Sequence, residues 1–354
     1  MRLNGINNKC NFRIIGFPGS KPMEVGNDET LPKNCFSRLH ACDDYILHSS
    51  VNELQQPKLA ISVSSNEILL FDVESQTKIG CNKTHQSKIT DLKFSKQEPN
   101  LLFSSSMDGT ILVCDLRNEV KPIQSYSDDS DGSLKPLTCF DYNSEEQYIC
   151  AGTEVIREDS FLIFWDKRMS KSIGGYWDSH FDEITQVQFH HSVESKLASA
   201  SVDGLVNFFD LDEITEEDAM NNTLNVESSV NKFSWGVTNA LSCITSTEEF
   251  QYWSTNEVKP AVSINKKQMS EDFMCDVDYL IDTFDVNNSI YLVSGTNEGS
   301  AQLYSCNKNG LKIMCELRDG HKDIIRTVCH SKKDSFLVTG GEDGILCIWK
   351  SPIK

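Results

Sequence analysis

The chain has 354 residues, 39 % of them hydrophobic, and a formal net charge of −19. This hydrophobic content suits a globular fold and argues against wholesale disorder, and no apolar run reaches the roughly 18 residues that a transmembrane helix needs. An acidic surface repels phosphates, so we expect neither direct nucleic-acid binding nor membrane contact.

Residues 1–33 are rich in Gly and Pro and predict a flexible N-terminal arm, whereas residues 34–354 predict one folded body. Met1–Ser20 has scattered charge and no continuous apolar run, which does not fit a signal peptide. Without a secretion signal, the thirteen cysteines are expected to be reduced thiols of an intracellular protein, nuclear or cytoplasmic. The set of Cys35, His40, Cys42 and His48 has no usual zinc spacing, so we expect no metal and no cofactor.

Three segments share one template of strands and turns. Each begins at a His, continues through alternating apolar residues, passes an Asp-Gly turn and ends in a second apolar run. The His and Asp residues are His85 and Asp108, His180 and Asp203, and His321 and Asp343. Asp-Gly between two apolar runs is a strong hairpin signal, and the His-to-Asp spacing differs by only one residue among the copies.

Four weaker copies fill the gaps between these three. The seven copies end at Phe71, Cys114, Trp165, Phe209, Trp253, Tyr304 and Trp349. Most intervals match a propeller repeat of about 40–45 residues. Two intervals are longer, because a charged insertion occupies residues 154–160 and a polar stretch occupies residues 256–276. Helical patterns are almost absent. The segment Ile214–Met220 could form a helical turn, but it fits an acidic loop equally well.

The last copy leaves too few residues after Trp349 for a fourth strand. A propeller must close its ring or expose a sheet edge. The alternating segment Phe36–Ala41 therefore predicts the missing strand, and Tyr45–His48 would begin the first blade. The expected fold is all-β, a seven-bladed propeller closed by an N-terminal strand.

The repeat resembles the WD40 family. Gly320-His321 matches its Gly-His pair, Asp343 its turn Asp, and Trp165-Asp166 its Trp-Asp pair. The resemblance covers about Phe36–Lys350. Within the family, the runs 149–154, 185–190 and 201–207 are similar to the WD repeat protein 89 group.

The resemblance implies a buried hydrogen-bonded set of His, Ser or Thr, Asp and Trp in a blade. The full set is His321, Thr339, Asp343 and Trp349, and partial sets are His180, Ser199 and Asp203, and His85, Ser104 and Asp108. A Ser-His-Asp hydrolase is the competing interpretation. Recurrence at repeat spacing favours a structural role, and no nucleophile elbow or phosphate loop is present. We therefore expect a protein that is not an enzyme.

The resemblance also implies a partner-binding rim beside the Asp turns. The matching positions are Lys88, Thr90, Met107, Glu183, Thr185, Val202, Ile324, Arg326 and Glu342. Met107, Val202 and Ile324 would offer apolar contacts, while Glu183 and Glu342 could receive a Lys or Arg. Each of these positions could equally be a solvated loop.

Two acidic clusters favour a basic partner. They are Asp128, Asp129 and Asp131, and Asp212, Glu213, Glu216, Glu217 and Asp218, and both are expected to follow the third strand of a blade. The main expectation is a monomeric scaffold within a larger complex that binds a basic protein. The alternatives are a subunit that recognises a substrate or a histone tail for an enzyme complex, and a ribosome-assembly adaptor. Tail recognition usually needs an aromatic cage or an acidic pocket at the central channel. The sequence offers acidic groups, but Trp177 and Trp235 are its only stray aromatic candidates.

Overall fold

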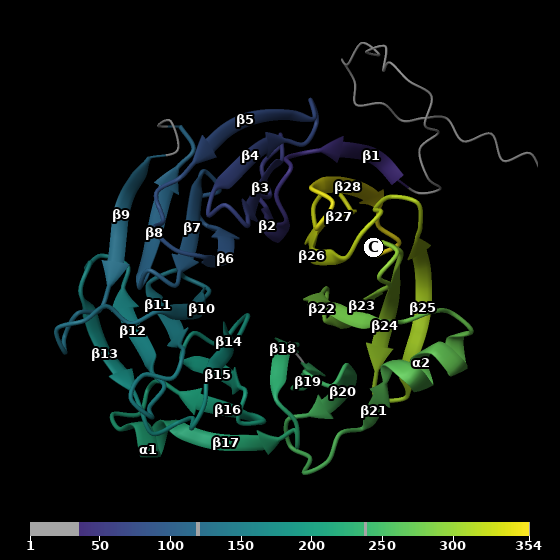
Figure 1. The fold of residues 1–354 in the computed structure, drawn as a ribbon. Coiled ribbons are helices and arrows are strands. Elements are labelled where there is room, and N and C mark those ends of the chain that lie inside the picture. The colour runs from purple at the N-terminus through teal and green to yellow at the C-terminus, as the bar shows by residue number, and fades with distance from the viewer. Residues whose placement is uncertain (1–34, 118–120, 237–238, 354) are drawn as a thin grey trace, which may run out of the picture. The chain divides into compact units, whose positions relative to one another are not determined.

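The computed structural model describes residues 35–117, 121–236 and 239–353. These residues belong to one compact unit, Leu31–Lys354. They form seven antiparallel sheets of four strands each, arranged as blades around a ring (Figure 1). The predicted arm of residues 1–33 lies outside the described residues and stays a prediction.

Six blades use four consecutive strands. Blade 1 contains β2 (Ile46–Val51), β3 (Lys58–Val63), β4 (Ile68–Asp72) and β5 (Thr77–Asn82), and blade 2 contains β6 (Ile89–Phe94), β7 (Leu101–Ser106), β8 (Thr110–Asp115) and β9 (Pro122–Ser127). Blade 3 contains β10 (Leu137–Tyr142), β11 (Tyr148–Thr153), β12 (Leu162–Asp166) and β13 (Ser172–Tyr176), and blade 4 contains β14 (Ile184–Phe189), β15 (Lys196–Ser201), β16 (Leu205–Asp210) and β17 (Met220–Asn225). Blade 5 contains β18 (Val230–Trp235), β19 (Ala240–Thr245), β20 (Glu249–Ser254) and β21 (Val262–Asn265), and blade 6 contains β22 (Tyr279–Val286), β23 (Ser289–Gly295), β24 (Ala301–Asn307) and β25 (Gly310–Leu317).

Blade 7 confirms the predicted ring closure. It contains β26 (Ile325–Ser331), β27 (Phe336–Gly341) and β28 (Ile345–Lys350), and its fourth strand is β1 (Cys35–His40), which lies beside β28 (Figure 1). The register pairs Cys35 with Trp349 and His40 with Ile345. At the turn before β28, Gly344 has a φ of +65° and accepts a hydrogen bond from the amide of Ala41. A Cβ at Gly344 would lie 1.9 Å from the Cys42 carbonyl oxygen, so this contact requires glycine.

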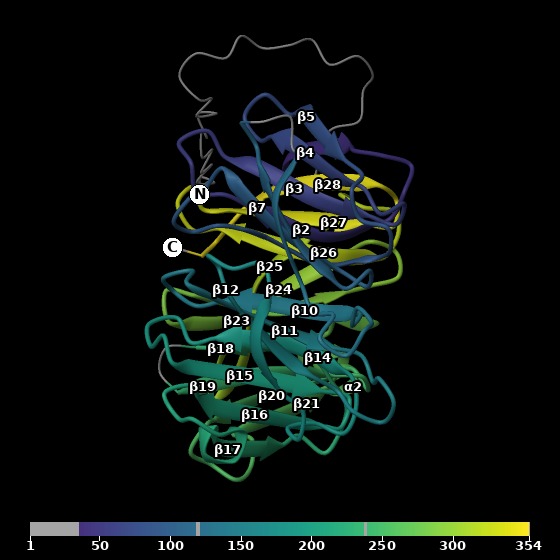
Figure 2. The same cartoon turned by 90° about the vertical axis from the view of Figure 1, so that its left-hand side faces the viewer.

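The core is divided into apolar layers between neighbouring blades. The seven predicted end positions all fall on third strands, where Trp165, Phe209 and Trp349 are fully buried. One layer packs Phe103 of blade 2 against Tyr142 of blade 3, with ring centroids 5.5 Å apart. The layer between blades 7 and 1 completes the circle. In the side view, blades 2, 3 and 4 follow one another in chain order (Figure 2).

The two long intervals have different structures. The insertion 154–160 is a tight loop in which Ile156 and Asp159 exchange backbone hydrogen bonds. The stretch 256–276 was expected to be only a long connection, but it contains β21 and the helix α2 (Lys266–Phe273). Asn265 caps this helix with Gln268 in a capping box, and Met269 is buried between blades 5 and 6. Of the two structures left open for Ile214–Met220, the helical turn is the one that forms, as α1 (Glu216–Ala219).

The cysteines of the described residues form no disulfide, and most of them are buried. Burial raises the pKa of the Cys139 thiol to about 11, so this group stays protonated at neutral pH. No helix in the described ranges is long and apolar enough to cross a membrane.

Removing the strand that closes the ring should destabilise the whole propeller. Deletion of residues 1–41 removes β1 and leaves β28 as an exposed edge. Each lost net hydrogen bond costs about 1 kcal/mol, so we expect Tm, measured by calorimetry, to fall by several degrees. Deletion of residues 1–27 is the control, because the described ring does not include them. Equal Tm changes in the two truncations would contradict the closing role of β1.

Candidate functional site

The four predicted tetrad residues of blade 7 form one continuous chain of hydrogen bonds. The Nδ1 atom of His321 lies 3.1 Å from Asp343 Oδ1, and its Nε2 atom lies 2.8 Å from Thr339 Oγ1. Trp349 Nε1 donates to the same Oγ1 at 2.8 Å. Because the carboxylate only accepts, His321 Nδ1 carries a proton that it donates to Asp343, while the Thr339 hydroxyl accepts from Trp349 and donates to His321 Nε2. Every polar atom of this chain therefore has a partner.

Blades 4 and 2 contain the partial sets in the same arrangement. His180 lies 2.9 Å from Asp203 and 2.7 Å from Ser199, and His85 lies 3.0 Å from Asp108 and 2.8 Å from Ser104. The connections are those of a Ser-His-Asp triad. However, Ser199 has no exposed surface and Ser104 only 1 %. A substrate carbonyl cannot reach either hydroxyl, so the geometry favours a structural role.

Other blades contain buried polar links that differ from the repeat template. In the connection between blades 2 and 3, Lys135 is 5 % exposed and its Nζ lies 2.5 Å from Asp128 Oδ2. In blade 5, Trp253 Nε1 donates to Gln251 Oε1 at 3.0 Å. The sequence analysis missed these links, because a single Lys or Gln has no repeat signature.

The turn carboxylates have lowered pKa values despite their partial burial. Burial alone would raise the pKa of Asp108, but hydrogen bonds from His85, Thr110 and the Gln86 amide lower it to about 2. The pKa of Asp203 and that of Asp343 are lowered for the same kind of reason, with His180 and His321 as donors. These groups are therefore ionised at neutral pH and hold both the His and the loop beside it.

The predicted rim residues lie on the face of the Asp turns but differ in availability. Lys88, Glu183 and Arg326 are exposed, and the other six are partly buried. The Thr90 hydroxyl already pairs with Ser105 at 2.9 Å, and that of Thr185 donates to the Val230 carbonyl at 2.7 Å.

Two more rim residues, Glu342 and Arg326, also have a partner inside the chain. Glu342 Oε1 accepts from Arg326 Nε at 2.6 Å, so its carboxylate already has a cation. Met107, Val202 and Ile324 remain as partly exposed apolar positions on this face.

An acidic patch with an exposed aromatic residue lies where blades 3 and 4 meet on this face. We call Glu154, Phe181, Asp182 and Glu183 the acidic rim patch. Phe181 is 80 % exposed. Burial, together with the charges of Glu154 and Asp182, raises the pKa of Glu183. Ser160 donates to the His180 carbonyl at 3.1 Å, which fixes the charged insertion beside this loop.

The sequence analysis identified only Glu183 of this patch. Phe181 directly follows His180, the His of a partial tetrad, and lies in a polar loop. An aromatic residue in a polar loop was the sequence signal that could have identified it as a surface contact. The two tryptophans considered for an aromatic cage lie outside this patch. Trp177 is 56 % exposed after the outer strand β13, and Trp235 is buried at the end of β18.

The placement predicted for the first acidic cluster was wrong. Asp128, Asp129 and Asp131 follow β9, which is the fourth strand of blade 2, because Pro122–Ser127 forms an outer strand that the pattern did not reveal. Asp128 is buried and paired with Lys135, so it is not a free surface charge.

The second cluster does follow a third strand, β16. Its Glu216 accepts from the amides of Trp177 at 2.9 Å and Asp178 at 3.0 Å, so this carboxylate has a structural partner. Within the described ranges, no group of three His, Cys, Asp or Glu could hold a metal ion.

Comparison with known families identifies repeats in two parts of the chain. The model of the WD domain, G-beta repeat, matches residues 76–115 and 312–350. The first match runs from β5, the outer strand of blade 1, to β8, the third strand of blade 2. The second runs from β25 to β28 in the same way. Each sequence repeat therefore spans two neighbouring blades.

Similar proteins of known name cover most of the chain. The WD repeat-containing protein GTS1 of Arabidopsis thaliana is 29 % identical over 87 % of this chain and 81 % of its own length. The WD repeat-containing protein 89 homolog of Dictyostelium discoideum is 24 % identical over 86 % of this chain and 82 % of its own. The nuclear pore complex protein nup43 of the same organism is 38 % identical over only 19 % of this chain and 16 % of its own.

Removing the turn carboxylate of blade 7 should destabilise the fold. In Asp343→Ala, His321 and the amides of Lys322 and Ile345 lose their acceptor. An unsatisfied buried group costs about 1–3 kcal/mol, which denaturant unfolding would measure. Asp334→Ala is the matched control, because Asp334 is exposed in the same blade. If the two variants were equally stable, the structural role of Asp343 would be refuted.

The contribution of Asp108 should depend on pH in acid. Its pKa is lowered from 3.8 to about 2 in the folded state, so its stabilisation is complete above about pH 4 and is lost as the pH falls through the folded value. Asp108→Asn should be less stable than the native chain at neutral pH, and the difference in unfolding free energy should shrink between about pH 4 and 2. Asp129→Asn is the exposed control. A difference that stays constant across this range would count against the assignment.

Proposed function

Because the chain is a seven-bladed WD40-repeat β-propeller, we propose that it is a non-catalytic scaffold that binds a basic segment of a partner protein. The binding surface in this proposal is the acidic rim patch on the face of the Asp turns. The predicted positions Glu183 and Val202 lie in or beside it, and the Val202 amide donates to the Glu183 carbonyl at 3.0 Å.

The environment of Glu183 is the observation that carries this proposal. The exposed Glu183 carboxylate lies near Glu154 and Asp182, and desolvation together with these two charges raises its pKa, while Lys88 offsets part of the rise. A Lys or Arg from a partner would relieve this repulsion. Phe181 offers an exposed ring beside it, and cations bind favourably over aromatic faces. Recognition of a basic tail is the form of binding that this arrangement favours.

Three further observations support a scaffold. The Ser199 and Ser104 hydroxyls of the triad-like sets are buried, which supports a structural role for these sets rather than a catalytic one. The unpaired cysteines of residues 35–353 support an intracellular site, nuclear or cytoplasmic. One relative is a nuclear pore complex protein, which supports a role within a larger complex. No described surface favours a ribosome-assembly role.

The test compares charge variants on the two faces of the ring. Partners are first captured by affinity purification with the full chain, and the association rate of the recombinant partner is then measured at several salt concentrations. We expect Glu183→Lys with Phe181→Ala to slow association by about tenfold at low salt, because electrostatic steering acts mainly on the on-rate. The rate for the native chain should fall steeply as salt increases.

The control is Asp212→Lys with Glu217→Lys, which reverses the charges of two exposed acidic residues on the other face. This variant should keep most of the native rate. An association rate that is insensitive both to salt and to the patch variant would refute the basic-partner proposal. If only the control variant lost binding to the partner, the binding surface would be assigned to the other face.

A further inference from the structure

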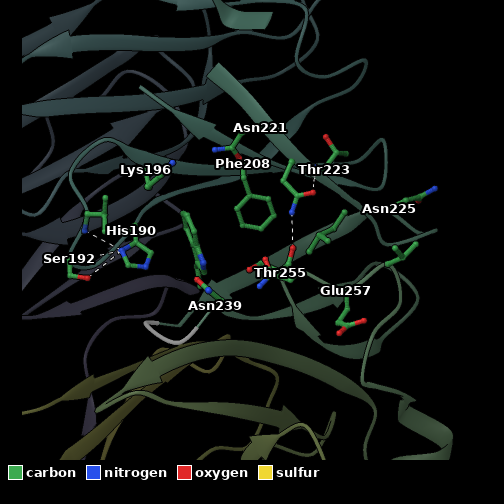
Figure 3. Close-up of a pocket in the computed structure, with 16 residues that line it drawn as sticks. His190, Ser192, Lys196, Phe208, Asn221, Thr223, Asn225, Asn239, Thr255 and Glu257 are labelled. Carbon is green, nitrogen blue, oxygen red and sulfur yellow. Dashed lines mark hydrogen bonds between the residues drawn. The ribbon is translucent and has the colours of Figure 1, made fainter. Parts of the chain in front are cut away.

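A groove separates blades 4 and 5 on the side away from the acidic rim patch. Its main hollow has a volume of about 900 Å³, and β17 contributes the five consecutive residues 221–225 to its wall. The opposite wall includes residues 255–258 of the loop between β20 and β21 (Figure 3). A second hollow of about 520 Å³ continues along the same blades and shares Asn225 and Val258 with the first.

The floor of the main hollow contains a buried hydrogen-bond donor without an acceptor. Trp235 is only 6 % exposed, and its Nε1 has no hydrogen-bond partner among the described residues. The indole packs edge-on against His190 at 4.8 Å and against Phe208 at 5.0 Å between ring centroids. A buried N–H without an acceptor destabilises the fold, and an acceptor that reaches it from the hollow would remove this cost.

His190 supplies a second donor to the hollow. Its Nδ1 accepts from the amides of Ser192 at 3.3 Å and Val193 at 3.2 Å (Figure 3). Burial lowers the pKa of this imidazole, so the ring is neutral at pH 7 and carries its proton on Nε2. Both ring donors call for carbonyl or carboxylate acceptors. Lys196, the cation in the lining, is already paired with Asp210 at 2.5 Å, which argues against a charged anion as the ligand.

The wall formed by β17 has a backbone edge without a partner strand among the described residues, although the Asn222 side chain donates across the groove to the Thr255 carbonyl at 2.7 Å. β17 is the outermost strand of blade 4 and pairs only with β16 among the described strands. An exposed strand edge can accept another extended chain through backbone hydrogen bonds. Two apolar side chains flank the hollow and are themselves exposed, since Val258 is 91 % and Val193 is 42 % exposed.

We propose that this groove binds an extended, uncharged segment of a partner protein. The segment pairs with the free edge of β17, places a backbone carbonyl on Trp235 Nε1, and packs an apolar side chain between Val193 and Val258. The two connected hollows suit a strand of about six residues, which spans about 20 Å. This surface is distinct from the acidic rim patch, so a scaffold of this kind could hold two partners at once.

The probe is a synthetic peptide selected from a library of short linear peptides displayed against the full chain. We expect Trp235→Phe, which keeps an aromatic ring but removes the N–H, to weaken its binding by about tenfold, or roughly 1.4 kcal/mol. Val258→Asp should weaken binding at least as much without disturbing the fold, because Val258 is exposed. Val155→Asp, the same change at an exposed valine beside the acidic rim patch, is the matched control.

A nuclear magnetic resonance titration tests the hydrogen bond directly. The indole N–H signal that disappears in Trp235→Phe should move when the peptide is added to the native chain. A signal that does not move, a selection that yields no peptide, or peptides sensitive only to Val155→Asp or Phe181→Ala would overturn the proposal. A concentration-dependent dimer that Val258→Asp disrupts would assign the groove to a second copy of the chain and would also overturn it.

Discussion

The structure depends on the requirement that every blade be covered on both faces. Each sheet is apolar on the two sides that meet its neighbours, and a single blade cannot bury either side alone. The apolar layers between successive blades meet this requirement only if the last blade also meets the first. The pairing of β1 with β28 and the layer between blades 7 and 1 provide that contact. The closed ring in turn holds both rims and the groove between blades 4 and 5 in fixed positions.

Buried polar links add specificity to this apolar packing. His321, His180 and His85 connect the loop at the start of a blade to the hairpin turn of the same blade. Where the His is absent, Lys135 with Asp128 or Gln251 with Trp253 supplies another satisfied pair. Different residue types can serve in different blades because the requirement is that each buried polar group be paired, not that one residue be present. This tolerance explains why only three of the seven copies are obvious in the sequence.

The sequence could predict those features that recur at fixed spacing. The aromatic and apolar end positions from Phe71 to Trp349 all lie on third strands, and the short tail after Trp349 correctly predicted closure by the N-terminal strand. Other features depend on contacts between blades, which a local pattern does not contain. The exposure of Phe181, the unpaired Nε1 of Trp235 and the partner of Lys135 belong to this class. The capping box of α2 was a local signal that the analysis overlooked.

The place of β1 in the chain has a consequence for biosynthesis. The strand is made early, but its partner β28 leaves the ribosome roughly 300 residues later, and at about 5–20 residues per second the interval is on the order of tens of seconds. During that time the nascent chain holds an unpaired strand at one end and an open arc of blades behind it. Exposed strand edges promote aggregation. Because of this topology, β1 needs protection from aggregation, by chaperones or by the ribosome surface, until β28 has been synthesised.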